Sequence, residues 1–248
     1  MTGTRRAATF SFVSPLLLRR KGAGPPTGWP LLFGPPRCLP TLRTNIYVDA
    51  FNLYYGCLKG TPYRWLNVQQ LCTQVLPKST VHRIRYFTAL VHERPDNPGT
   101  NARQQVYLRA LRTIPELSIH LGYYLTHAVL MRECLSSGKA GRSVRVLKTE
   151  EKGSDVNLAT YLLFDAFRND YDTAVVVSND SDLCEPIRIV RHELGNAVGL
   201  LNPHPNPSRA LLQHATFIKQ IRRGVLAKSQ FPTILKDQDG EFHKPVSW

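Results

Sequence analysis

The sequence predicts an α/β protein in which a mostly parallel central sheet is flanked by helices. Short runs rich in β-branched residues alternate with amphipathic segments of ten or more residues, which is the pattern of strands joined by crossover helices. Apolar residues make up 42% of the 248 residues, enough for a sizeable core. The alternation runs through residues 44–222, where we expect a single domain, followed by a C-terminal tail over residues 223–248.

Residues 1–43 are expected to lie outside this domain. The segment is rich in Pro, Gly and Arg, and proline is incompatible with helix interiors and central strands. A secretory signal would need a longer apolar run than the one Pro15 interrupts, and no small-residue cleavage site follows it. An Arg-rich segment without acids is also typical of an organellar transit peptide. We expect a disordered basic extension. A start codon assigned too far upstream would explain such a segment.

The first half of the domain is predicted to hold three strands and two helices. The strands are predicted over 45–50, 83–91 and 117–125, and the helices over 67–76 and 101–114. The second helix places Tyr107, Leu111 and Ile114 on one face, which we expect to be buried.

The second half continues the alternation of strands and helices. A strand or hairpin arm over 143–148 precedes a long helix over 154–169, a buried strand over 173–178, a helix to about residue 193, a strand over 197–201, a short helix near 207–215 and the apolar segment 217–221. Val156, Ala159, Leu163 and Phe167 have helical spacing in the long helix. A crossover at the centre of the sheet would make strands 45–50 and 173–178 neighbours.

Acidic residues stand where the predicted strands end. Asp49 ends the first strand, Asp180 and Asp182 follow strand 173–178, and Asp155 opens the long helix. Ligands of open α/β sheets bind beyond the carboxyl ends of the strands, so we expect these four carboxylates to converge. Carboxylates without His or Cys select hard cations such as Mg²⁺ or Mn²⁺.

Each acid also has a structural interpretation. Asp155 lies in a first helical turn after Ser154, a plausible N-cap, and the helix dipole would stabilise it there by roughly 0.3–1 kcal/mol. Asp182 and Glu185 have the spacing of a capping pair. Capping accounts less well for Asp49, because this residue ends an apolar strand. Acids at separate strand ends on one edge of the sheet favour the metal site.

Three segments of the sequence form a set of motifs: TNIYVDAFNLYYG, KTEEKGSDVNLATYLL and VVVSNDSDLCEPIR. They resemble the three motifs of the NYN domain family of PIN-like nucleases, and the resemblance covers about residues 43–222. It implies a single Rossmann-like (PIN-like) domain whose catalytic metal ligands are four aspartates: Asp49, Asp155, Asp180 and Asp182. Asn52 and Ser178 match supporting positions that would contact substrate or a metal-bound water.

The resemblance also implies an activity, the cleavage of RNA by a Mg²⁺- or Mn²⁺-dependent endonuclease. Two metal ions about 3.5–4 Å apart would hold a phosphate oxygen and activate a water molecule, and the product would carry a 5′ phosphate. Lys148 and Lys152 flank Asp155 and are candidates for contacting phosphates, although both also fit solvated surface lysines. The basic loop 136–145 either follows a nucleic-acid backbone or is an ordinary insertion.

Charge and aromatic residues fit a single-stranded RNA partner. The formal charge is +14, and residues 1–48 contain seven Lys or Arg and no acid. Four aromatic residues follow the first acid and would either stack on unpaired bases or pack in the core: Tyr54, Tyr55, Tyr63 and Trp65.

Cysteine usage and hydropathy bear on the compartment. The five cysteines are scattered and have no C-x-x-C spacing, which fits the reducing cytoplasm and argues against a disulfide framework. No run of about 18 apolar residues occurs, so we expect no membrane span.

Two further functions remain open. A non-catalytic RNA-binding module could keep the fold, although no acidic position of the motifs is missing. Some sequences with a similar YVDAFNLYYG start are known as NADH-dependent hydroxylases of a succinylated hydroxypyridine in nicotine degradation. No G-x-G-x-x-G fingerprint supports that chemistry here, and no G-x-S-x-G supports a serine hydrolase.

Overall fold

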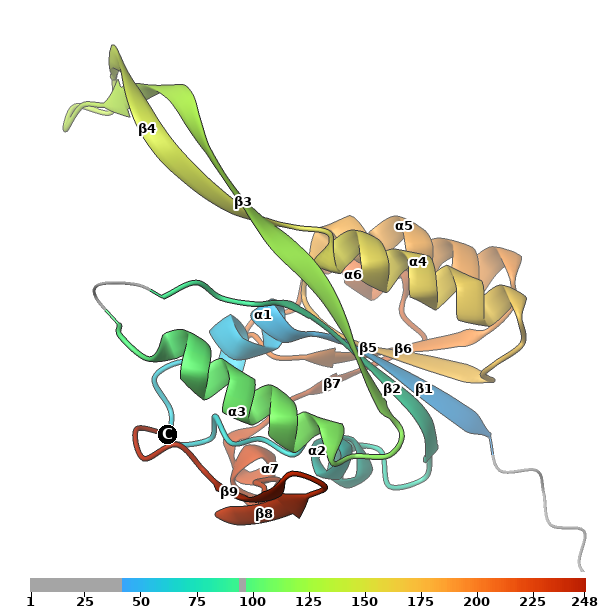
Figure 1. Ribbon diagram of the computed structural model, residues 1–248. Coiled ribbons are helices and arrows are strands. Elements are labelled where there is room, and N and C mark those ends of the chain that lie inside the picture. Colours follow the sequence, from blue (N-terminus) through green and yellow to red (C-terminus); the bar gives the residue numbers. More distant parts are fainter. Residues whose placement is uncertain (1–41, 94–96) are drawn as a thin grey trace, which may run out of the picture. The chain divides into compact units, whose positions relative to one another are not determined.

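Seven strands form the central sheet in the order β4-β3-β2-β1-β5-β6-β7 (Figure 1). The computed structural model describes residues 42–93 and 97–248, so the predicted extension over 1–43 lies almost wholly outside the described residues. The strands are β1 (Arg43–Asp49), β2 (Thr80–Ala89), β3 (Leu117–Cys134), β4 (Ala140–Lys152), β5 (Thr173–Val177), β6 (Ala197–Asn202) and β7 (Phe217–Gln220).

Parallel pairing dominates the sheet, as the sequence predicts. Every neighbouring pair is parallel except β3 and β4, which form an antiparallel hairpin. The first strand and the strand before Asp180 are neighbours, with Ile46 opposite Val175 and Val48 opposite Val177. Ile46, Tyr47 and Val48 are fully buried, because helices cover both faces of the central strands.

Helices form one layer on each face of the sheet (Figure 1). One layer contains α2 (Val68–Val75), α3 (Thr100–Arg112) and α7 (Arg223–Lys228), whose side chains share a core with β1 and β2. The other contains α4 (Ser154–Phe167), α5 (Cys184–Arg188) and α6 (Arg209–His214), around a second core. Among the described residues, no helix is both long and apolar enough to cross a bilayer.

The predicted buried face is confirmed for helix α3, whereas helix α4 buries a different face from the one that its spacing indicated. Tyr107, Leu111 and Ile114 are all buried. In α4, however, Val156 and Phe167 are 68% and 67% exposed, and the buried face carries Leu158, Leu162, Asp165 and Ala166. This helix is apolar on most sides, so helical spacing alone admits more than one buried face.

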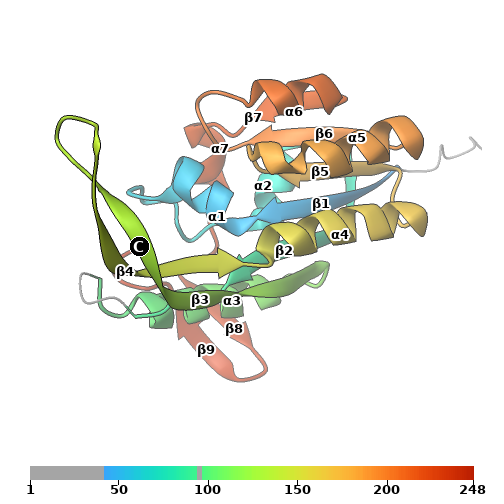
Figure 2. The same cartoon turned by 90° about the horizontal axis from the view of Figure 1, so that it is seen from above.

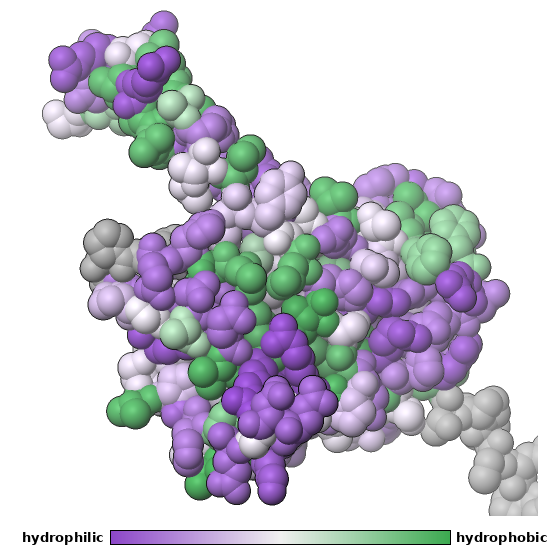
Figure 3. All heavy atoms as spheres, in the orientation of Figure 1, coloured by the Kyte–Doolittle hydropathy of each residue, from purple (hydrophilic) through white to green (hydrophobic). Residues whose placement is uncertain are grey.

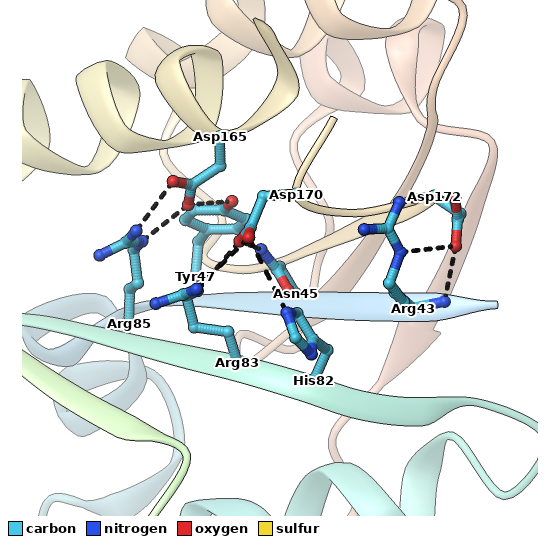
Figure 4. A network of polar contacts seen from close by, with 9 residues as sticks. All are labelled: Arg43, Asn45, Tyr47, His82, Arg83, Arg85, Asp165, Asp170 and Asp172. Atoms are coloured by element: carbon cyan, nitrogen blue, oxygen red, sulfur yellow. Dashed lines mark hydrogen bonds and ion pairs between the residues drawn. The ribbon is translucent and has the colours of Figure 1, made fainter. Parts of the chain in front are cut away.

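A buried aspartate decides how α4 lies on the sheet (Figure 4). Both Asp165 oxygens accept hydrogen bonds from Arg85 of β2, at 2.7 and 2.8 Å, and one also accepts from the Tyr47 hydroxyl at 2.8 Å. The side chains of Asp165 and Arg85 are 3% and 11% exposed. A buried charge must be paired, so this contact fixes the C-terminal half of α4 on β1 and β2.

Two further aspartates fasten the connection from α4 to β5. Asp170 accepts hydrogen bonds from Arg83 at 3.0 Å and Asn45 at 2.8 Å, and Asp172 pairs with Arg43 at 3.3 Å (Figure 4). These carboxylates meet cations near the start of β1, at the opposite end of the strand from Asp49.

The β3–β4 hairpin extends beyond the sheet as an arm (Figures 1 and 2). After Gly122, β3 pairs only with β4, so both strands are longer than the sequence predicts. The arm exposes large apolar side chains, among them Leu130 at 71% and Leu147 at 78% (Figure 3). The basic loop 136–145 forms its tip and the start of β4.

The last residues of the chain pack against α3. They form α7 and a hairpin of β8 (Ile234–Asp237) and β9 (Gly240–His243), for which the sequence predicted no elements. Arg109 of α3 donates two hydrogen bonds to Asp237, at 2.7 and 2.6 Å. Leu226, Phe231 and Phe242 are buried in the core that contains α3.

Candidate functional site

Asp49 ends β1 and at the same time caps the next helix. Its Oδ1 accepts a hydrogen bond from the Asn52 backbone N–H at 2.9 Å, which makes it the N-cap of α1 (Ala50–Leu53). The expectation that capping does not explain this residue well is therefore wrong. The reason is that the chain turns directly from strand to helix, so that one residue ends β1 and caps α1. A π-helix, η1 (Tyr54–Leu58), follows α1. Asp49 as a whole is 4% exposed.

Ser178 and Asn52 join the ends of β1 and β5. Ser178 is buried; its hydroxyl donates to Asp49 Oδ2 at 2.9 Å and accepts from the Asp180 backbone N–H at 3.1 Å. Asn52 Oδ1 accepts from the Asn179 backbone N–H at 2.9 Å. Both residues thus hold the two strand ends together. The contact with substrate or a metal-bound water that the sequence predicts for them stays a prediction.

Asp180 and Asp182 take different positions in the turn after β5. Asp180 Oδ1 accepts from the Asp182 backbone N–H at 3.0 Å and caps the short 3₁₀ helix η2 (Ser181–Leu183). Asp180, not Asp182, is therefore the capping residue of this turn. Asp182 is exposed and does not line the cleft described below, although its charge acts on Asp155.

Asp155 lies in the first turn of α4, but Ser154 is not its cap. The N-cap is Gly153, and Ser154 turns back to Glu151, to which its N–H and hydroxyl donate at 3.1 and 2.8 Å. Glu151 fits there because β3 has Gly122 beside it. A Cβ on Gly122 would lie 2.4 Å from Glu151 Oε1.

These strand and helix ends enclose a cleft of about 240 Å³. Its lining residues in the described part of the chain are Asp49, Phe51, Asn52, Tyr55, Glu151, Ser154, Asp155, Asp180 and His204. In Figures 1 and 2, α1 and the first turn of α4 lie at the same end of β1. The predicted Lys148 and Lys152 do not line the cleft, and both pair with Glu150, at 2.6 and 3.3 Å.

The charges of the cleft are not neutralised by the protein. Burial raises the pKa of Asp49 to about 6, against hydrogen bonds that lower it, and the neighbouring Asp155 and Asp180 raise it further. Burial, followed by Asp180, Glu151 and Asp182, also raises the pKa of Asp155. Within the described residues, no Lys or Arg forms an ion pair with any cleft carboxylate.

The chemistry of this donor set fits a hard divalent cation, although the acidic side chains do not form a preformed ion site. Carboxylate, amide and hydroxyl oxygens are the ligands of Mg²⁺ and Mn²⁺. In the described part of the chain, no three acidic, His or Cys side chains stand close enough to hold an ion. The hydrogen bonds to Asp49 and Asp180 occupy only part of the lone pairs of each carboxylate.

Sequence reasoning did not assign Glu151, Phe51 or His204 to the site. Phe51 and Glu151 lie inside two of the quoted motifs. They were not chosen, because the candidates were acids at the ends of predicted strands and at the start of the long helix. His204 follows β6, so the same rule applied to strand 197–201 would have pointed to it. Tyr55 was one of four candidate aromatic residues, and nothing in the pattern distinguished it from the others.

Comparisons with known proteins agree with the motif positions. The model of the NYN domain matches residues 43–222. The 6-hydroxy-3-succinoylpyridine 3-monooxygenase of Pseudomonas putida is 33% identical over 236 residues, which cover 84% of this chain and 75% of that protein. A crystal structure of a protein of unknown function from Vibrio parahaemolyticus has a TM-score of 0.48 and 17% identity, covering 74% of this chain and 94% of that one. The chain belongs to the NYN domain family, a family of PIN-like nucleases.

Proposed function

We propose that this protein is a metal-dependent ribonuclease that hydrolyses phosphodiester bonds of single-stranded RNA. The observation that carries the proposal is the cleft with Asp49, Asp155, Asp180 and Glu151, whose carboxylates form no ion pair with a Lys or Arg of the described residues. Elsewhere in the same domain, Asp165, Asp170 and Asp172 are each paired with an arginine. The contrast supports a cleft that receives its positive charge from a bound ion.

Residue roles follow from this arrangement. Asp49, Asp155 and Asp180 would hold Mg²⁺ or Mn²⁺, with Asp182 at the rim as the fourth predicted ligand. When bound, such an ion supplies an activated water and stabilises the charge that develops on the phosphate. Ser178 would orient the Asp49 carboxylate, to which its hydroxyl donates. Asn52 and Ser178 would position the turn that carries Asp180, because they accept hydrogen bonds from the backbone N–H groups of Asn179 and Asp180.

A second function is favoured by one finding, the relative from P. putida whose name is that of a monooxygenase. If this chain shared that activity, the substrate would be a pyridine that carries a carboxylate. Two observations favour hydrolysis. All the acidic groups that line the cleft are carboxylates of the kind that bind Mg²⁺, and the cleft of about 240 Å³ is below the roughly 300–1,000 Å³ typical of cofactor sites.

The deciding experiment measures both reactions with one preparation of the full chain. RNA cleavage with Mn²⁺ is followed by sequencing of the released 5′-phosphate ends, and NADH oxidation is followed with 6-hydroxy-3-succinoylpyridine. Asp49→Asn and Asp180→Asn should lower RNA cleavage by at least about 100-fold, because loss of even an outer-shell partner of a metal costs 10–100-fold.

Asp239→Asn serves as the matched control, since Asp239 is exposed and is not among the residues that line the cleft. It should cleave RNA as the wild type does. Pyridine-dependent NADH oxidation without RNA cleavage would overturn the proposal in favour of the monooxygenase. Equal cleavage by wild type and by folded Asp49→Asn would show that the carboxylates are not the reaction centre.

A further inference from the structure

The cleft has a second flank that carries no carboxylate. Along the sheet, Asp155 and Glu151 come from the β4–α4 side and Asp49 and Asp180 from the middle, whereas His204 follows β6 beyond β5. Tyr55 of η1 lines the cleft as well. A π-helical turn places Tyr55 at the cleft, and such turns occur frequently at functional sites.

The structure separates Tyr55 from the other aromatic residues of its neighbourhood. Trp65 is fully buried, and Tyr54 and Tyr63 pack against the main core. Tyr55 remains 54% exposed at the cleft. Its ring is nonetheless held in place, because the Lys59 ammonium lies 4.8 Å from its centroid and Tyr54 meets it edge-on at 5.3 Å. Exposed aromatic rings that are held in place are the kind of surface on which unpaired bases stack.

His204, which lines the same cleft, is held in place by its backbone and lies against a glycine. Its N–H donates to Asn202 Oδ1 at 3.0 Å, and its carbonyl accepts from Asn202 at 2.8 Å and Gln220 at 2.6 Å. Its imidazole lies against Gly56, the residue after Tyr55. A Cβ there would lie 2.9 Å from His204 Cδ2 and 3.0 Å from Nε2.

His204 also differs in chemistry from the acidic residues of the cleft. Among the lining residues that the structure describes, it is the one with an imidazole ring. Neither ring nitrogen forms a hydrogen bond to another described residue. An imidazole N–H in this position can donate to an anion that reaches the cleft.

We propose that Tyr55 and His204 form a nucleotide subsite, in which an unpaired base stacks on Tyr55 and the adjacent phosphate accepts a hydrogen bond from His204. The proposal rests on the proposed ribonuclease function and adds the residues that would hold a nucleotide beside the carboxylates. A base can reach an aromatic ring in this way only when it is splayed out of a helix, so the subsite selects single-stranded over double-stranded RNA.

The test measures stacking directly and does not depend on cleavage. Full-length Asp180→Asn protein is titrated with a short single-stranded RNA containing 2-aminopurine, whose fluorescence is quenched when the base stacks. Tyr55→Ala in that background should weaken binding about ten-fold, the order expected for loss of one base–aromatic stack, and abolish the quenching. Tyr55→Phe should retain both, because the ring remains.

Further variants separate base stacking from phosphate binding and from general effects on RNA affinity. His204→Ala should weaken binding several-fold while leaving the quenching of bound RNA, and Gly56→Ala, which displaces the imidazole, should act in the same direction. Tyr123→Ala is the matched control, because Tyr123 is 63% exposed on the arm and lies outside the cleft. It should bind as the parent protein does.

The outcomes separate the subsite from the proposed function. Wild-type cleavage of RNA with binding unaffected by Tyr55→Ala overturns the subsite and leaves the ribonuclease. Tyr55-dependent quenching in a wild-type chain that cleaves no RNA supports the subsite and overturns the ribonuclease. Equal affinity for duplex and single strand overturns the subsite. Binding of 6-hydroxy-3-succinoylpyridine that depends on Tyr55, in a protein that binds no RNA, also overturns the subsite. That ligand has an aromatic ring and an anionic group, as a nucleotide does, but it is not a nucleotide.

Discussion

Asp49 shows how one side chain serves both the fold and the site. As the N-cap of α1 it stabilises the turn from strand to helix, and as a buried carboxylate beside Asp155 and Asp180 it is costly to ionise. The ordinary pKa of an aspartate is 3.8, and burial raises that of Asp49 to about 6. The folded chain therefore binds a proton more tightly than the unfolded chain between these pH values, so its stability falls as pH rises through this window.

The first prediction is that Asp49→Asn stabilises the metal-free protein at neutral pH. Asn keeps an oxygen for the Asn52 N–H and carries no charge, so the gain in EDTA at pH 7–8 should be about 3 kcal/mol in the free energy of unfolding, from a shift of about two pKa units. The gain should shrink toward zero near pH 4, where wild-type Asp49 is protonated. Urea denaturation across this pH range measures it. A variant less stable than wild type at pH 7 would mean that the hydrogen bond from Ser178 outweighs the burial of the charge.

Helix α4 is the element that carries Asp155 to the cleft. Its first turn bears that residue, and Asp165, near its other end, binds Arg85 and Tyr47. The helix is thus held at both ends, by Ser154 and Glu151 at the start and by the buried ion pair three turns later. The position of Asp155 relative to Asp49 depends on both attachments.

The second prediction is that Asp165→Asn destabilises the protein by roughly 3–5 kcal/mol, because it leaves the buried Arg85 guanidinium unpaired. Arg85→Met with Asp165→Leu should cost less than Asp165→Asn alone, since no uncompensated charge remains. Chemical denaturation of the two single variants and the double variant measures the coupling. Asp170→Asn is a comparison at a more exposed pair and should cost less. A loss under about 1 kcal/mol for Asp165→Asn would show that α4 is held by apolar packing alone.

The third prediction concerns the β3–β4 arm. Beyond Thr126 and Thr149, which face each other across the hairpin, no residue of the arm belongs to either core. Replacing residues 127–148 with an Asn-Gly turn should therefore change the free energy of unfolding by less than about 1 kcal/mol. It should also remove the exposed Leu130 and Leu147 and so reduce self-association.

Urea denaturation and sedimentation velocity of the shortened chain test both parts of this prediction. Leu130→Ser with Leu147→Ser, which keeps the arm, is the control for self-association. A large loss of stability on shortening would mean that the arm supports the end of the sheet where Gly122 and Glu151 meet.

At the scale of the whole molecule, the sequence predicts the strand order at the sheet centre better than the details of the site. β-branched runs and acids at strand ends were enough to make β1 and β5 neighbours and to bring Asp49 and Asp180 together. Side-chain direction was not predictable in the same way. Lys148 and Lys152 lie close to Asp155 in sequence, yet they pair with Glu150, and the intervening Glu151 points to the cleft.

Contacts between distant segments account for the remaining differences. The buried face of α4 is set by Arg85, 80 residues away, and no helical period contains that information. Gly56 and His204 are distant in sequence, and their contact depends on the order of the strands in the folded sheet. Capping by Asp49 was hidden because a strand runs into a helix with no loop between them.

The last prediction follows from a centre built from elements on both sides of β1. An ion that joins Asp49 of β1, Asp155 of α4 and Asp180 after β5 binds the folded chain and not the unfolded one, so it must raise stability by RT ln(1 + [L]/Kd), about 2.7 kcal/mol at a hundred times Kd. Mn²⁺ should raise Tm at lower concentration than Mg²⁺, and the same order should hold for RNA cleavage. Ca²⁺ should raise Tm without supporting cleavage, because its longer and looser coordination does not give in-line geometry. Asp155→Asn should lose both effects of Mn²⁺, whereas Asp239→Asn should keep them. If Mn²⁺ left the Tm of the wild type unchanged, the folded chain would not bind the ion. If Mn²⁺ raised the Tm of Asp155→Asn equally, the ion would bind outside the cleft. Either result would contradict a metal site at the cleft carboxylates.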